Sequence, residues 1–132
     1  MNVVEVESSL DGLVAAYPSL CELIELPHLT YEGRTSHALR IGTEPSTNPG
    51  VLFIGGVHAR EWGSCEISIY FAADLLEAYQ KGTGLVYGGK SFSATQIKTI
   101  TESFTSQGRS PSKLSAHLRS RTVGQLYRQC HC

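Results

Sequence analysis

The short apolar run Val51–Ile54, ended by Gly55-Gly56, constrains the fold more than any other segment of this chain. Four consecutive apolar residues between chain-breaking segments predict a strand that is buried on both faces. The two glycines allow the backbone to turn tightly after it. A helix is predicted directly downstream, capped by Ser64 and running to about Gln80, where Gly82-Thr83-Gly84 ends it. Strand, turn and helix in this order are typical of an α/β fold.

The chain around this unit shows further elements. Ser9 or Asp11 is expected to cap a helix that Pro18 stops. Along the helix after the glycines, an apolar stripe from Ile67 to Ala78 recurs at helical spacing and is predicted to be core. The other predicted elements are two antiparallel strands, Leu23–Leu26 and Ser36–Ile41, joined through a turn at Tyr31–Arg34, a loop at Thr43–Gly50, and a helix Ser93–Ser103 with a Ser93/Gln96 capping box.

Two candidate metal ligands follow the predicted buried strand. His58 and Glu61 follow the two glycines and lie three residues apart, just before the predicted helix. Imidazole nitrogen and carboxylate oxygen are both ligands that zinc uses in proteins. Open α/β folds place their sites beyond the carboxyl ends of strands, where this pair is expected to lie. The pattern therefore predicts part of a divalent-metal site.

In this region the chain resembles the zinc carboxypeptidases of the carboxypeptidase A-like peptidase family M14. The resemblance spans about Leu10 to Glu102 and is most specific in Gly-Gly-Val-His-Ala-Arg-Glu-Trp, residues 55–62. It implies a mixed β-sheet flanked by helices, of which this chain holds the opening portion. It also implies that His58 and Glu61 are two of three zinc ligands, and that Arg60 binds substrate beside the metal, where a planar guanidinium suits a peptide carbonyl or carboxylate.

The implied reaction is zinc-dependent hydrolysis of the C-terminal peptide bond of a peptide or protein. The family's third zinc ligand, its general base and its carboxylate-binding residues come further downstream than this chain extends, so no catalytic residue is identifiable here. His117 and His131 are the local substitutes for a third ligand, but neither follows a convincing strand, and we interpret both as solvated. Cys130-His131-Cys132 resembles a metal motif in composition alone.

The chain changes character near Phe104. All twelve acidic residues lie before this point, whereas the segment after Thr105 holds five basic residues and no acid. We therefore divide the chain into residues 1–104, the carboxypeptidase-like part, and residues 105–132, a divergent basic tail that we expect to be poorly ordered. A reading-frame shift, an unspliced intron or alternative splicing would explain such an ending.

Structural interpretations of the same residues stay open. His58 and Glu61 could form only a local hydrogen bond in a polar loop, and Arg60 could pair with Glu61 or Glu66. Glu32-Gly33-Arg34 is expected to be a turn with an ion pair. The four cysteines are too few and too irregularly spaced for a disulfide framework, and Cys21 and Cys65, in apolar surroundings, are expected to behave as small hydrophobes.

Three functions compete: a zinc metallocarboxypeptidase; a catalytically inactive fragment or interaction module that lacks the third ligand and general base; and a nucleic-acid-binding tail. The third is weak, because the basic segment has one aromatic residue and no known module, and we expect neither a nucleic-acid nor a membrane partner. The start of the chain lacks the basic and apolar regions of a secretory signal, whereas many members of the family are secreted, so the localisation stays open. The sequence gives no indication of the oligomeric state. A sheet cut after its first strands also predicts marginal stability or aggregation.

Overall fold

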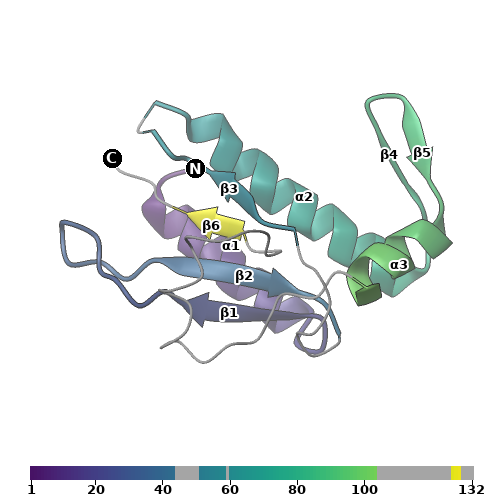
Figure 1. The fold of residues 1–132 in the computed structure, drawn as a ribbon, viewed down its shortest axis with the longest axis horizontal. Coiled ribbons are helices and arrows are strands. Elements are labelled where there is room, and N and C mark those ends of the chain that lie inside the picture. The colour runs from purple at the N-terminus through teal and green to yellow at the C-terminus, as the bar shows by residue number, and fades with distance from the viewer. Residues whose placement is uncertain (44–50, 59, 104–125, 129–132) are drawn as a thin grey trace.

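The computed structural model describes residues 1–43, 51–58, 60–103 and 126–128. Within these ranges lie three helices and six strands (Figure 1). The elements are α1 (Val3–Ala16), β1 (Cys21–Glu25), β2 (His37–Ile41), β3 (Phe53–Gly55), α2 (Trp62–Lys81), β4 (Leu85–Tyr87), β5 (Lys90–Phe92), α3 (Ala94–Ser103) and β6 (Leu126–Arg128).

Four strands form a mixed sheet in the order β1-β2-β6-β3. β1 and β2 are antiparallel, with Leu23 opposite Leu39, as the alternating pattern predicted. β6 is antiparallel to β2 and parallel to β3, with Tyr127 opposite Ile54. The predicted α/β class with a mixed sheet is therefore confirmed.

β6 belongs to the segment for which we expected poor order. Within it, Leu126–Arg128 forms a strand between β2 and β3. Three residues with polar neighbours carry almost no local strand signal, so the pairing depends on contacts with distant parts of the chain. The rest of the segment, residues 104–125 and 129–132, lies outside the described residues.

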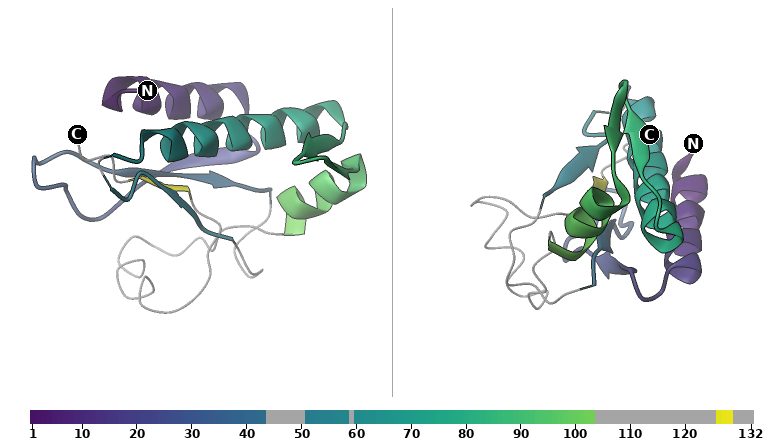
Figure 2. Two further views of the ribbon diagram at one scale, coloured as in Figure 1. Left: turned by 90° about the horizontal axis from the view of Figure 1, so that it is seen from above. Right: turned by 90° about the vertical axis from the view of Figure 1, so that its right-hand side faces the viewer.

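α1 and α2 lie side by side on one face of the sheet, as both views of Figure 2 show. The main core fills the space between these helices and the β1–β2 hairpin. Its fully buried members include Leu76 at 0% exposure and Leu39 at 2%. The whole cluster comprises Val6, Leu10, Leu20, Cys21, Leu39, Ile69, Ala72 and Leu76.

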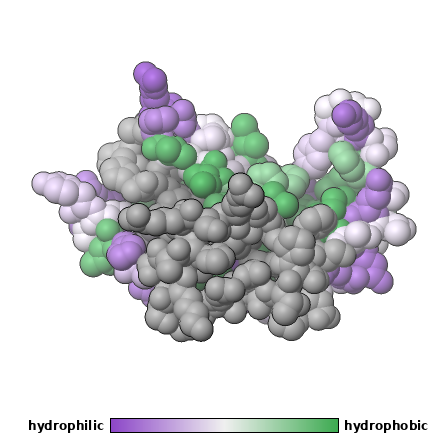
Figure 3. All heavy atoms as spheres, in the orientation of Figure 1, coloured by the Kyte–Doolittle hydropathy of each residue, from purple (hydrophilic) through white to green (hydrophobic). Residues whose placement is uncertain are grey.

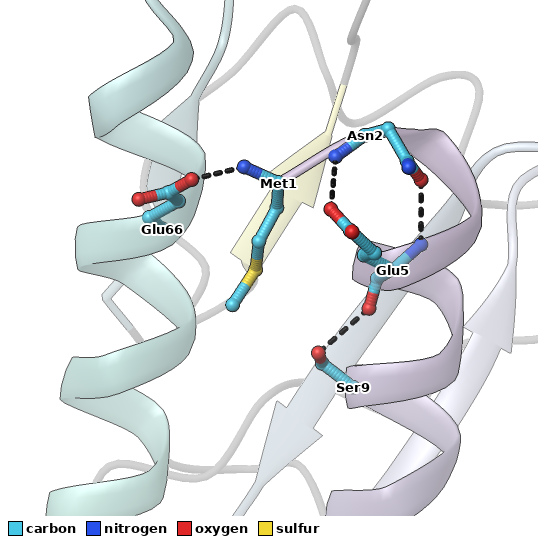
Figure 4. A network of polar contacts seen from close by, with 5 residues as sticks. All are labelled: Met1, Asn2, Glu5, Ser9 and Glu66. Carbon is cyan, nitrogen blue, oxygen red and sulfur yellow. Dashed lines mark hydrogen bonds and ion pairs between the residues drawn. The ribbon is translucent and has the colours of Figure 1, made fainter.

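α1 begins earlier than the sequence suggested. Asn2, not Ser9 or Asp11, is the N-cap: its side chain accepts from the amide of Glu5, whose carboxylate accepts from the amide of Asn2. This capping box and an ion pair between the amine of Met1 and Glu66 on α2 are drawn in Figure 4. The early start lets Val6 and Leu10 reach the core, and the helix ends at Ala16, before Pro18, as predicted.

The core face of α2 also differs from our prediction. Ile67, which we placed in the core stripe, is 70% exposed. α2 carries two apolar stripes, and the one that contacts α1 and the sheet contains Ile69, Ala72 and Leu76. At the other end of the predicted stripe, Ala78 is buried, in a second cluster with Leu75 and Ile97 from α3.

The strand before the two glycines is less covered than predicted. Phe53 is 46% exposed and Ile54 is 51% exposed, so β3 is not buried on both faces. An apolar run shows that a strand can be buried, but neighbouring surfaces decide whether it is. Here β3 is the last strand of the described sheet, with α2 packed against it.

Several other predicted features are confirmed, whereas the predicted loop Thr43–Gly50 lies, apart from Thr43, outside the described residues. Gly33 has φ 74° in the turn after β1, where Arg34 and Glu32 form an ion pair of 3.1 Å. Gly82 adopts the left-handed conformation that ends α2. The Ser93/Gln96 capping box starts α3. None of the helices in the described ranges is long and apolar enough to cross a bilayer.

Candidate metal centre

The candidate site lies in the connection between β3 and α2. β3 ends at Gly55, and Gly56 follows with φ 67°, a conformation that favours glycine. The chain then turns through His58 and enters α2, with Glu61 as its N-cap residue. The amide of Glu61 donates to the carbonyl of His58 at 3.0 Å, which closes the turn that brings the two residues together.

Ser64 anchors this connection. Its hydroxyl donates to the carbonyl of Glu61 and accepts from the amide of Gly56, both at 2.7 Å. We predicted Ser64 as the N-cap of α2, which is wrong, because α2 begins at Trp62 and Ser64 lies within its first turn. Sequence reasoning missed the anchoring role, although a serine this close to a glycine turn was a usable signal.

The predicted metal ligands point toward each other. Nδ1 of His58 lies 3.0 Å from Oε1 of Glu61. Both side chains are open to solvent, with 68% and 46% of their surfaces exposed. The hydrogen bond with His58 lowers the pKa of the Glu61 carboxyl below its ordinary value, so the carboxylate is ionised at neutral pH.

This geometry fits half of a zinc site. An imidazole nitrogen and a carboxylate oxygen stand together at the carboxyl end of a strand, and both can bind a metal. The same contact is also the local hydrogen bond between His58 and Glu61 that we considered as a purely structural interpretation. No cluster of three or more His, Cys, Asp or Glu residues occurs within the described part of the chain. His117, His131, Cys130 and Cys132 lie outside that part.

Arg60 lies between the two candidate ligands in sequence and is exposed. The predicted structural partners of Arg60 are engaged elsewhere, since Glu61 contacts His58 and Glu66 pairs with the amine of Met1. No ion pair of Arg60 is found among the residues that the structure describes.

Comparison with known proteins identifies this segment. A family model described as zinc carboxypeptidase matches residues 6–86, which include β1 to β3, the candidate site and α2. Rat carboxypeptidase A1 is 32% identical over 75 residues, which cover 57% of this chain and 18% of the relative. Carboxypeptidase B of Astacus astacus is 41% identical over 58 residues, covering 44% and 19% of the two chains.

Catalytically inactive relatives match as well. Inactive metallocarboxypeptidase ECM14 of Ajellomyces dermatitidis is 35% identical over 92 residues, which cover 67% of this chain and 15% of the relative. The matched segments thus span less than a fifth of the length of these relatives.

The fold is similar to that of a solved structure, bovine thrombin-activatable fibrinolysis inhibitor in complex with tick carboxypeptidase inhibitor. The TM-score is 0.54 at 19% identity, covering 94% of this chain and 40% of the other. This likeness concerns the fold alone. The family match over residues 6–86, which is more than half of the chain, shows that the chain belongs to the zinc carboxypeptidase family.

Proposed function

We propose that this chain contributes part of the active site of a zinc-dependent metallocarboxypeptidase. In this proposal His58 and Glu61 hold the metal, and the reaction is hydrolysis of the C-terminal peptide bond of a peptide or protein. The observation that carries the proposal is the 3.0 Å approach of Nδ1 of His58 to Oε1 of Glu61, inside the segment that the family model matches.

The roles of the residues follow from their chemistry. A metal would bind the neutral imidazole of His58 and the ionised carboxylate of Glu61. The metal, when bound, supplies a Lewis acid and an acidified water. Arg60 is exposed beside these residues, and its always-charged fork would orient the carbonyl or the terminal carboxylate of a peptide.

Zinc titration of the purified chain by calorimetry tests the ligand assignment. We expect weak binding of one zinc ion, because two ligands give less affinity than the three of an ordinary catalytic site. His58→Ala and Glu61→Gln should each weaken binding at least about tenfold. His28→Ala is the matched control, since His28 is an exposed histidine outside the site. Equal binding by the wild type and the His58→Ala variant would remove the assignment.

A non-catalytic role is the second candidate. It is favoured by the absence of a third potential ligand near His58 and Glu61 among the described residues. The match to the inactive fungal relative, over 67% of the chain, points the same way. A chromatographic assay of C-terminal residue release from a model peptide separates the two: zinc-dependent release that a chelator and His58→Ala both abolish supports the enzyme, and no release at saturating zinc supports the inactive role.

A further inference from the structure

The hydroxyl of Ser64 is bonded to both ends of the turn that carries the candidate metal ligands. It accepts from the amide of Gly56, which comes shortly before His58, and it donates to the carbonyl of Glu61. A serine hydroxyl has one hydrogen to donate, and the bond to Glu61 uses it. The side chain of Ser64 therefore ties the start of the turn to the candidate ligand at its end.

The strand and the helix on either side of the turn are packed together. The rings of Phe53 on β3 and Phe71 on α2 lie 5.2 Å apart. Figure 3 shows hydrophobic side chains gathered along β3 and α2. These contacts determine where the turn begins and where it ends, but they do not determine the path of the backbone between the two points.

The turn itself has little packing to hold it in place. Val57, His58 and Glu61 are all exposed. The bond from the amide of Glu61 to the carbonyl of His58 closes the turn internally, but it does not connect the turn to β3. The distance between the two candidate ligands therefore depends on the backbone, and the two bonds of Ser64 are the contacts that join this backbone to the end of β3.

We propose, on the basis of the proposed function, that Ser64 is a positioning residue for the metal site. Through its two bonds, the hydroxyl sets the separation of the side chains of His58 and Glu61. Removal of a group that orients metal ligands commonly weakens metal binding by about 10- to 100-fold. Ser64 contacts the backbone of the turn and not the ligating atoms, so we expect an effect at the lower end of that range.

Proton NMR of the metal-free chain tests the positioning directly. Because Nδ1 of His58 lies 3.0 Å from Oε1 of Glu61, we expect nuclear Overhauser contacts between the ring protons of His58 and the methylene protons of Glu61. Ser64→Ala should abolish these contacts, whereas Ser64→Thr keeps a hydroxyl and should retain them. Ser68→Ala is the matched control, since the hydroxyl of Ser68 donates to the carbonyl of Ser64 within α2.

Zinc titration of the same variants by calorimetry measures the consequence for the site. Ser64→Ala should weaken zinc binding about tenfold. Ser64→Thr and Ser68→Ala should bind zinc as the wild type does. Ser93→Ala is a second control, because it removes the side-chain cap of α3 and lowers stability without changing the turn. Ser64→Val against Ser64→Thr repeats the comparison with two side chains of similar shape, should Ser64→Ala fail to fold.

The two measurements separate a positioning role from a general loss of stability. Overhauser contacts that persist in Ser64→Ala would overturn the proposal, and so would their absence from the wild type. Unchanged zinc affinity of Ser64→Ala, or equal weakening by Ser93→Ala, would overturn it as well. Failure of the proposed function looks different: the wild type would not bind zinc, while loss of the contacts in Ser64→Ala would still support the positioning role. Circular dichroism confirms that each variant is folded.

Discussion

The backbone of Gly55 passes so close to Ser64 that a Cβ at position 55 would lie 2.7 Å from the carbonyl oxygen of Ser64. Real side chains essentially never approach a backbone oxygen so closely. The first glycine of the pair thus allows β3 to lie directly against the first turn of α2. This contact brings the candidate ligands to the end of the sheet.

The first prediction is that Gly55→Ala destabilises the protein by about 1–3 kcal/mol, because β3 and α2 must separate to admit the methyl group. Urea unfolding followed by circular dichroism measures the change. Gly12→Ala is the control: nothing lies within 4 Å of a Cβ at Gly12 in the interior of α1. Alanine there should stabilise the protein by about 0.5–1 kcal/mol. Similar losses at both positions would show that the close approach is not the cause.

The second prediction concerns the hydroxyl of Ser64. Ser64→Ala removes the acceptor for the buried amide of Gly56 and the donor to the carbonyl of Glu61. An unsatisfied buried amide costs about 1–3 kcal/mol. Hydrogen exchange should show the amide of Gly56 exchanging faster than in the wild type.

Ser68→Ala is the matched control for Ser64→Ala. Ser68 lies one turn later in α2, and its hydroxyl donates to the carbonyl of Ser64 within the same helix. Its removal should change stability by less than about 0.5 kcal/mol and leave the exchange of Gly56 unaltered. Faster exchange of Gly56 in both variants would mean that the helix as a whole, and not the Ser64 contact, protects the turn.

Local signals predicted the parts of the fold that local contacts determine. The turn at Gly33, the end of α2 at Gly82 and the Ser93 capping box depend on residues within a few positions of one another. The β1–β2 pairing joins residues 12 to 20 positions apart, but the two strands follow one another in sequence. The β4–β5 hairpin was not predicted, although Gly88 and Gly89, with φ 56° and 75°, form the two-residue turn that usually marks such a hairpin.

Features that depend on long-range contacts could not be predicted from local sequence signals. β6 pairs with strands more than 70 residues away, and nothing local specifies that register. The exposure of Ile54 and Ile67 depends on which surfaces pack against β3 and α2. At the candidate site, spacing predicted that His58 and Glu61 meet, whereas the anchoring contact of Ser64 spans eight residues and was mistaken for a helix cap.

The third prediction tests the start of α3. The hydroxyl of Ser93 accepts from the amide of Gln96, and the side chain of Gln96 accepts from the amide of Ser93. Ser93→Ala should therefore cost about 1 kcal/mol of unfolding free energy, measured by urea unfolding. Ser91→Ala is the comparison, since Ser91 is exposed on β5 and its replacement should stay within about 0.5 kcal/mol. Equal effects of the two changes would contradict a capping role.

The fourth prediction is a loss of stability in alkali that depends on Cys21. Burial raises the pKa of its thiol from 9.0 to about 11, and its Sγ lies 3.3 Å from the carbonyl of Tyr17. Because the folded-state pKa is the higher one, the stabilising contribution is complete below pH 9. It is lost as the pH rises to 11, since the unfolded chain ionises first. The loss should be on the order of 1–2 kcal/mol.

Cys21→Ser isolates this contribution. Serine keeps a hydrogen-bond donor for the carbonyls of Leu13 and Tyr17 but does not ionise in this range. Other groups also titrate between pH 9 and 11, so the informative quantity is the difference between the two unfolding curves under reducing conditions. The difference in unfolding free energy should be constant below pH 9. Above pH 9 the wild type should lose stability relative to the Cys21→Ser variant. Parallel curves across the whole range would mean that the thiol is equally acidic in the folded and unfolded chains.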